Sequence, residues 1–248
     1  MLLQNKVVLV TGGATGIGEA TSEMIATEGA AVVVADMNTQ EGNATVAAIK
    51  SAGGQARFVE TDVTSSASVA ALVRFVEGEF GRLDILISCA GVYASPNVRV
   101  DDYEEAVWDK LLDVNLKGSF LCAHHVVPLM EKGGRGVILF MGSTAGTRVP
   151  SGSVAYGASK GGIQGLAYTL EAQLKPAGIR VNVVCPDQIA TPLKLQAIRD
   201  IAAQEGITEQ EALAEWEPRL GHPDGVARVL VMLASDAADY VTGMIYTR

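Results

Sequence analysis

The stretch that decides the fold is Lys6-Val7-Val8-Leu9-Val10-Thr11-Gly12-Gly13-Ala14-Thr15-Gly16-Ile17-Gly18. Residues 6–11 form an unbroken apolar and β-branched run, which is typical of a parallel strand buried on both faces. A helical pattern follows over residues 19–27. Glycines between such a strand and a helix allow a sharp turn, and the free amides of the new helix face an anion such as a pyrophosphate. The stretch therefore predicts a nucleotide-binding unit rather than an ordinary turn.

The second predicted strand, residues 30–35, ends at Asp36. In dinucleotide-binding folds a carboxylate near this position accepts hydrogen bonds from the adenosine ribose hydroxyls. Asp36 would repel a 2′-phosphate, and neither Met37 nor Thr15 is a base that could pair with one. The pattern therefore favours NAD over NADP. The structural alternative is that Asp36 caps the helix that begins near residue 39.

The alternation of strands and helices continues along the whole chain. The further expected elements are helix 40–51, strand 56–60, helix 66–79, strand 83–88, helix 101–132, strand 136–141, helix 153–175, strand 179–185, helix 222–234 and strand 244–246. Such alternation predicts parallel strands joined by right-handed crossovers, which means an α/β fold with a doubly wound sheet.

Two predicted loops lie at the carboxyl edge of this sheet, where open α/β sheets bind ligands. One begins with Asp62-Val63 and the other contains Ala90-Gly91. Asp62 could accept a hydrogen bond from the adenine amino group, or it could cap the helix near Ser65. The residues alone leave both interpretations open.

Composition limits the other classes of function. The chain has 248 residues, 48% of them hydrophobic, without a break in composition, so we expect one domain over residues 1–248. The net charge of -9 argues against nucleic acid or an anionic membrane as a partner. No signal peptide or membrane-spanning run is evident, which predicts a cytoplasmic protein. Cys89, Cys122 and Cys185 are odd in number and lack metal-ligand spacing, so we expect free thiols and no metal site.

Three polar residues in the second half of the chain could form a catalytic site. Tyr156 and Lys160 lie four residues apart in the expected helix 153–175 and so share one face, and Ser143 follows an expected strand. A nearby ammonium would lower the pKa of the phenol from ~10 towards about 7. Ser143 could then donate to a carbonyl oxygen while Tyr156 moves a proton. Alone, the Tyr-Lys pair could be a chance surface pair, but the glycine-rich stretch favours catalysis.

Together these residues resemble the short-chain dehydrogenase/reductase family over essentially the whole chain. The resemblance rests on Thr11 to Gly18, Asp62, Ala90-Gly91, Asn115-Leu116-Lys117-Gly118, Ser143, Tyr156 with Lys160, Pro186 and Thr191. It implies a single-domain Rossmann fold with parallel strands in the order 3-2-1-4-5-6-7, and a nicotinamide cofactor. It also implies a homotetramer or homodimer, because the helices over 101–132 and 153–175 pair between subunits in that family.

The resemblance assigns roles to a catalytic tetrad. Tyr156 is the general acid/base, Ser143 orients the substrate, and Lys160 also holds the nicotinamide ribose. Asn115 fixes a kink and a water that relays protons to Lys160. The implied cofactor contacts are Gly12, Thr15, Gly16, Ile17, Gly18, Asp36, Met37, Asp62, Val63, Cys89, Ala90, Gly91, Tyr156, Lys160, Pro186, Ile189 and Thr191.

Departures from the family pattern lie close to these positions. Ser88-Cys89 stands where the family usually has two asparagines, and Asp187 stands where it has glycine. We hypothesise that Asp187 faces the substrate and disfavours anionic substrates. Residues 188–218 resemble the mobile substrate lid of the family, and the alternative is a solvated helix with buried Leu and Trp side chains.

The sequence therefore predicts an NAD(H)-dependent oxidoreductase that interconverts a small secondary alcohol and a ketone. Two alternatives remain. One is a 3-oxoacyl-thioester reductase of the same family, which would more often use NADPH. The other is a dinucleotide-binding sensor without catalysis.

Overall fold

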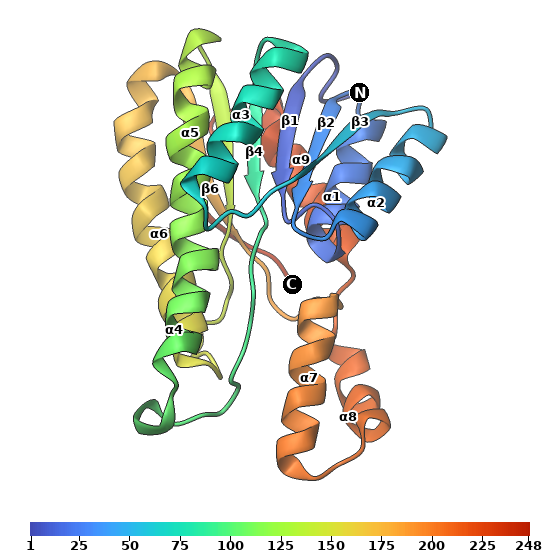
Figure 1. Cartoon of the computed structure of the whole chain (residues 1–248), viewed down its shortest axis with the longest axis vertical. Helices are drawn as coiled ribbons and strands as arrows, with labels where there is room; N and C mark the ends of the chain where they lie inside the picture. Colours follow the sequence, from blue (N-terminus) through green and yellow to red (C-terminus); the bar gives the residue numbers. More distant parts are fainter.

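Seven parallel strands form one sheet in the order β3-β2-β1-β4-β5-β6-β7, which confirms the expected topology (Figure 1). The computed structural model describes residues 1–248. The strands are β1 Val7–Thr11, β2 Ala31–Asp36, β3 Gln55–Glu60, β4 Ile85–Ser88, β5 Gly136–Met141, β6 Ile179–Cys185 and β7 Gly243–Tyr246. All residues of β1, β4 and β5 are buried, which the apolar run of residues 6–11 predicted for β1.

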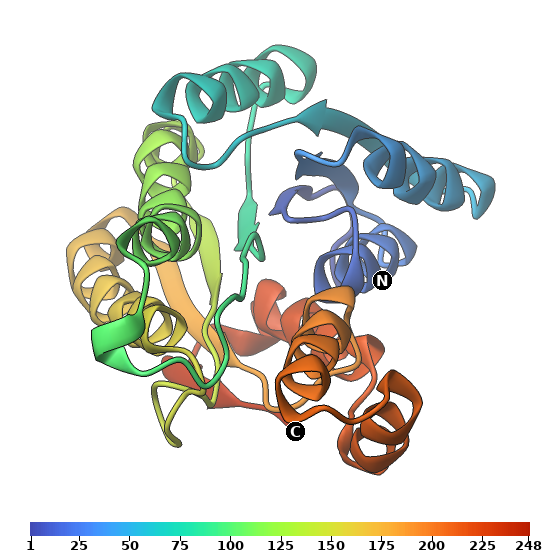
Figure 2. The same ribbon diagram turned by 60° about the horizontal axis from the view of Figure 1, so that its bottom comes forward.

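Helices cover both faces of the sheet (Figures 1 and 2). They are α1 Gly16–Thr27, α2 Thr39–Ser51, α3 Ser66–Phe80, α4 Glu105–Leu112, α5 Gly118–Lys132, α6 Val154–Leu174, α7 Pro192–Glu205, α8 Glu209–Trp216 and α9 Pro223–Ala234. Residues of α3, α5 and α6 pack on one face, and residues of α1, α2 and α9 pack on the other. No helix is both long and apolar enough to span a bilayer.

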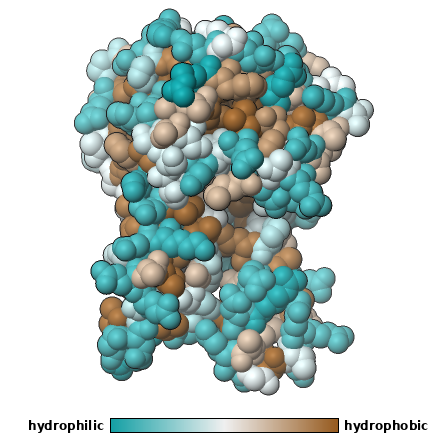
Figure 3. Space-filling model, in the orientation of Figure 1, coloured by the Kyte–Doolittle hydropathy of each residue, from teal (hydrophilic) through white to brown (hydrophobic).

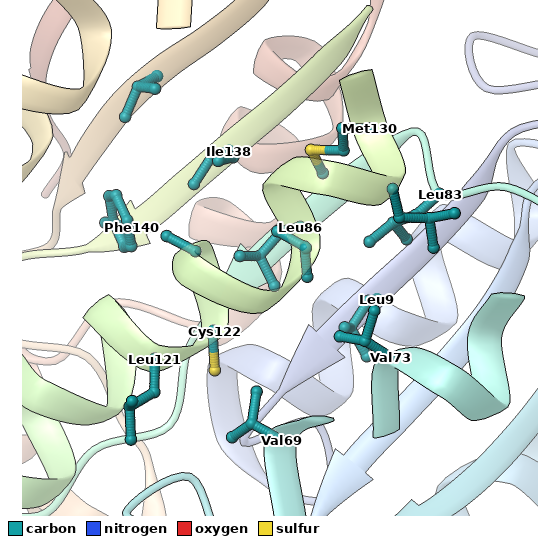
Figure 4. Close-up of a cluster of buried hydrophobic side chains, with 14 of the residues drawn as sticks. Leu9, Val69, Val73, Leu83, Leu86, Leu121, Cys122, Met130, Ile138 and Phe140 are labelled. Atoms are coloured by element: carbon teal, nitrogen blue, oxygen red, sulfur yellow. The ribbon is translucent and has the colours of Figure 1, made fainter. Parts of the chain in front are cut away.

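An apolar core lies on each face of the sheet. The core on the face that α3, α5 and α6 cover joins the middle strands to α3 and α5. Figure 4 shows Leu9 and Leu86, from neighbouring strands, lying against Val73 of α3 and Cys122 of α5. Every one of these side chains is at most 9% exposed. Removal of such a surface from water is the main favourable term in folding, so this core fixes the sheet that carries the site.

The strands end together at one edge of the sheet. Thr11 pairs in register with Ser88, and Ser88 pairs with Phe140 on the next strand. The loops after β1, β4 and β5 therefore begin at the same level. Figure 2, which brings the lower end of Figure 1 forward, shows α7 on one side of this edge and α4 on the other.

The expected long helix over residues 101–132 is interrupted twice, and one interruption contains Asn115, where the family resemblance implied a kink. A 3-10 turn, Val100–Asp102, precedes α4, and a π-helical turn, Asp113–Lys117, separates α4 from α5. Wide turns of this kind are rare in helices, and those that occur often lie at functional sites. This one contains Asn115, whose buried side chain bonds to a neighbouring loop.

Residues 192–218 form a helical pair that projects below the body of the molecule (Figure 1). A small apolar cluster holds α7 and α8 together around Ile198, Ala202 and Ala212. At the start of α8 the Thr208 hydroxyl accepts from the Glu211 amide, and the Glu211 carboxylate accepts from the Thr208 amide. Such a capping box fixes where a helix begins. The pair thus has a core of its own, and its inner side faces the edge of the sheet.

Candidate active site

A cavity of about 930 Å³ opens between the carboxyl edge of the sheet and the helical pair α7 and α8. Figure 3 shows apolar side chains in the hollow between the body of the molecule and its lower part. Every one of the predicted cofactor contacts lines this cavity, from Gly12 to Thr191, and so do Ser143, Tyr156 and Lys160. Asn115 is fully buried behind the cavity wall.

The glycine-rich loop brings backbone amides to the cavity. A Cβ atom added to Gly18 would lie 2.0 Å from the carbonyl oxygen of Gly12, so only glycine fits there. Gly12 itself has a φ of +65° and packs against Ala90. The helix α1 begins at Gly16, and the Thr15 side chain makes no capping bond, which leaves the first amides of the helix free for an anion. This cradle fits the diphosphate of a dinucleotide.

Asp36 lies at the end of β2 beside this loop. Its carboxylate accepts hydrogen bonds from the amides of Ala14, at 3.1 Å, and Asn38, at 3.0 Å. The cap of α2 is Asn38 and not Asp36, because the Asn38 side chain accepts from the Glu41 amide. The alternative of a helix cap is therefore wrong, and the Asp36 carboxylate, which lines the cavity, retains acceptor capacity for hydroxyl groups.

Asp62 also lines the cavity, and it does not cap the helix that follows. Its Oδ1 atom accepts from the amide and the hydroxyl of Thr64, at 2.9 and 2.7 Å. The cap of α3 is Ser65, whose hydroxyl accepts from the Ser68 amide. Asp62 is thus held by a local turn at the wall of the cavity.

Tyr156 and Lys160 project from one face of α6, towards Ser143 in the loop after β5. The Nζ atom of Lys160 lies 5.6 Å from the centre of the Tyr156 ring and donates to the carbonyl oxygen of Met141 at 2.8 Å. The Ser143 hydroxyl accepts from the Ala145 amide at 3.1 Å. The fold therefore brings the three residues together, as the sequence predicted.

Burial dominates the ionisation of this group. It raises the pKa of Tyr156 to about 12, and the Ser143 hydroxyl opposes that shift. It lowers the pKa of Lys160 to about 8, against the effect of Cys89 and Cys185 nearby. The expected fall of the Tyr156 pKa towards about 7 is thus not found: the pKa of the phenol is raised, and burial is the largest cause.

Asn115 holds the loop after β4 against α6. Its Oδ1 atom accepts from the Val92 amide at 2.8 Å, and its Nδ2 atom donates to the Val92 carbonyl and the Ser159 hydroxyl, each at 3.0 Å. Ser159 in turn donates to the Tyr156 carbonyl. Asn115 therefore positions the helix that carries Tyr156.

The two departures from the family pattern both face the cavity. Burial raises the pKa of Cys89 to about 12, so its thiol is neutral. Asp187 is exposed, and its carboxylate accepts from the Thr144 hydroxyl at 3.0 Å. This placement agrees with the hypothesis that Asp187 faces the substrate, while its effect on substrate choice stays a prediction.

Two further residues of the cavity, Tyr93 and Lys194, were not predicted from the sequence. The Tyr93 ring packs edge-on against Tyr156, with the ring centres 4.9 Å apart. Lys194 lies in the first turn of α7, and its Nζ atom lies 3.7 Å from the centre of the Trp216 ring. Tyr93 follows Ala90-Gly91 at the ligand edge, which was an available signal. Nothing in the sequence pattern indicated the stacking of Lys194 on Trp216.

A doubly wound sheet, a glycine cradle at a helix start and a Tyr-Lys pair in one cavity define a dinucleotide-binding oxidoreductase. The family model for short chain dehydrogenases matches residues 6–201. This chain belongs to the short-chain dehydrogenase/reductase family.

Three known proteins illustrate the range of its relatives. The cis-4-hydroxycyclohexanecarboxylate dehydrogenase of Sinomonas cyclohexanicum is 38% identical over 243 residues, which cover 97% of this chain and 93% of that protein. A crystal structure of levodione reductase has a TM-score of 0.92 at 28% identity, covering 98% of this chain and 96% of that one. An actinorhodin polyketide ketoreductase variant, solved with NADPH, has a TM-score of 0.92 at 27% identity, covering 98% and 95%.

Proposed function

We propose that this enzyme interconverts a secondary alcohol and a ketone with NAD(H) as the preferred cofactor. The observation that carries the proposal is the convergence of Ser143, Tyr156 and Lys160 on the cavity that Asp36 and the glycine cradle also line. The relatives described above include enzymes named for a hydroxy compound and for ketones. Their names support the class of reaction and leave the particular substrate open.

A bound nicotinamide would supply the hydride donor or acceptor, which the side chains of the protein lack. The diphosphate would be held by the glycine-rich loop, through Gly12, Thr15, Gly16, Ile17 and Gly18. At the adenosine end the contacts would come from Asp36, Met37, Asp62 and Val63, and at the nicotinamide end from Cys89, Ala90, Gly91, Pro186, Ile189 and Thr191.

The proton is moved by this chain's own residues. Ser143 donates to the carbonyl oxygen of the substrate, and Tyr156 gives its phenol proton to the same oxygen in reduction or takes it in oxidation. Lys160 bears its charge beside the phenol and would hold the nicotinamide ribose. Because burial raises the pKa of Tyr156, formation of phenolate requires positive charge beside the ring, which Lys160 provides and to which an oxidised nicotinamide would add when bound.

The preference for NAD rests on Asp36. Its carboxylate lines the cavity beside the exposed side chain of Met37, and a 2′-phosphate placed there would meet one negative charge and no adjacent cation. We further propose a cytoplasmic homotetramer or homodimer, in line with three free cysteines and with the family resemblance of α5 and α6.

A second candidate is reduction of a 3-oxoacyl thioester, which the likeness to the polyketide ketoreductase favours. Initial rates on secondary alcohols, ketones and 3-oxoacyl thioesters, each with NAD(H) and NADP(H), separate the candidates. We expect turnover of simple alcohols or ketones with NAD(H). Faster turnover of thioesters with NADPH would favour the second candidate. Binding of NADH without any turnover would favour a dinucleotide sensor.

A further inference from the structure

One wall of the cavity belongs to the helical pair and carries a single cation. Residues of α7 reach the cavity at helical spacing, and Trp216 of α8 continues the wall. The residues that line it from α7 are Pro192, Leu193, Lys194, Ala197, Ile201 and Glu205. The other lining lysines are Lys160, in the catalytic group, and Lys110, on α4. The apolar part of the wall therefore surrounds one ammonium group, that of Lys194.

The ammonium of Lys194 has no anionic partner in the protein. Its Nζ atom lies 3.7 Å from the centre of the Trp216 ring and takes part in no hydrogen bond or ion pair. The residue is half-buried, and burial lowers its pKa while the charge of Asp187 opposes that shift. A partly desolvated charge is costly unless it is paired. An anion that enters the cavity would therefore bind favourably beside Lys194.

The acidic groups near this wall are already engaged or exposed. Asp187 accepts from the Thr144 hydroxyl, at 3.0 Å, and from the Gln188 amide group, at 3.4 Å. Glu215 forms an ion pair with Arg219 at 3.2 Å. Glu205 is exposed at the opposite end of α7. Asp187 weakens the attraction of an anion without cancelling it, because its own charge is hydrogen-bonded and solvated.

We propose that Lys194 binds a carboxylate of the substrate, so that the alcohols and ketones that this enzyme converts are hydroxy acids and oxo acids. The proposal rests on the proposed function, since it names the class of substrate for the same cavity. It modifies the hypothesis on Asp187, which then limits anion affinity rather than excluding anions. The stacking on Trp216 directs the ammonium towards α8, whereas the glycine cradle has its own amides for the cofactor phosphates.

An equilibrium measurement tests this proposal without turnover. Benzoate and benzamide have nearly the same shape and differ in charge, and their dissociation constants can be measured by calorimetry on the NADH-loaded protein. We expect Lys194→Met and Lys194→Gln to weaken benzoate binding by about tenfold or more and benzamide binding hardly at all. Lys194→Arg should restore benzoate binding. Arg199→Met, which removes a cation of α7 paired with Glu209, is the matched control and should change neither.

Two results would overturn the proposal. In the first, the wild-type protein binds benzoate no more tightly than benzamide. In the second, Lys194→Met and Lys194→Gln weaken NADH binding and leave the preference for benzoate intact, which would assign the lysine to the cofactor. Turnover adds a separate readout, because 4-oxopentanoate should lose its advantage over its methyl ester in the Lys194→Met variant. Failure of both compounds to react, with benzoate binding intact, would contradict the proposed reaction and not the anion site.

Discussion

The ammonium of Lys160 lies one helical turn from Tyr156, 5.6 Å from the centre of its ring, and donates to the carbonyl oxygen of Met141 at the end of β5. This contact ties α6 to the sheet and places a buried cation beside a phenol. Burial moves the pKa of each group towards its neutral form, to about 8 for Lys160 and about 12 for Tyr156. Charge in this site is therefore costly until a ligand compensates it.

The shifted pKa of Lys160 predicts a pH dependence of stability. Because the pKa falls from 10.5 to about 8 on folding, the unfolded chain binds more protons between these pH values, and the contribution of Lys160 to stability rises with pH across them. The Lys160→Met variant lacks this contribution. Its free energy of unfolding relative to the wild type should fall by about 2 kcal/mol between pH ~7 and pH ~9.5. Urea unfolding at both pH values measures this change, and a constant difference would show that Lys160 is not perturbed.

Substitution by alanine should have opposite effects on stability at a glycine of the cradle and at a glycine of α3. Gly18→Ala would place a Cβ atom 2.0 Å from the Gly12 carbonyl oxygen, so we expect a loss of about 1–3 kcal/mol in unfolding free energy and weaker NADH binding. Gly78→Ala, in α3, meets no atom within 4 Å and should stabilise by about 0.4–1 kcal/mol with NADH binding unchanged. Thermal unfolding and NADH fluorescence titration test both. Equal effects of the two substitutions would argue against the close contact in the cradle.

The choice of cofactor depends on the charge of Asp36. The Asp36→Asn variant keeps the size of the side chain and one oxygen acceptor but removes the charge that repels a 2′-phosphate. We expect NADH to bind about tenfold more weakly and NADPH to bind more tightly than in the wild type. Dissociation constants for both nucleotides provide the readout. An unchanged ratio of the dissociation constants of NADH and NADPH would show that Asp36 does not determine the choice of cofactor.

The buried amide of Asn115 should matter more than an exposed one. Asn115→Ala leaves the amide and carbonyl of Val92 without their side-chain partners, so we expect a loss of about 2–3 kcal/mol in unfolding free energy. Asn43→Ala removes one exposed hydrogen bond to the Thr39 carbonyl and should change stability by less than about 0.5 kcal/mol. Denaturant unfolding of the two variants makes the comparison. Similar values would mean that the loop after β4 is held by other contacts.

Much of the fold followed from the sequence because its signals are local. The apolar run of residues 6–11 and the glycines after it place β1, the cradle and α1 without reference to the rest of the chain. The order of the strands came from the family resemblance. The family resemblance implied a kink at Asn115, but no local pattern showed that the kink is a π-helical turn, or that the Asn115 side chain bonds to Val92, far away in the sequence.

The sequence predicted which residues line the site better than it predicted their pKa values. Residues that directly follow strands could be assigned to the cavity lining, because parallel strands bring their ends to one edge. The four-residue spacing of Tyr156 and Lys160 placed both side chains on one face of a helix. The pKa of Tyr156 was not predictable, because desolvation depends on how many atoms surround the phenol. Lys194 was missed for a similar reason: its stacking on Trp216 joins two helices whose packing the sequence does not encode in any local pattern.

The central claim is that Tyr156 moves the proton during hydride transfer, and the Tyr156→Phe variant tests it most directly. The variant keeps the ring that packs against Tyr93 and loses only the hydroxyl. With an alcohol or ketone that the wild type converts, we expect kcat to fall by about a hundredfold or more, with the dissociation constant of NADH nearly unchanged. A variant that binds NADH and retains wild-type kcat would contradict the account.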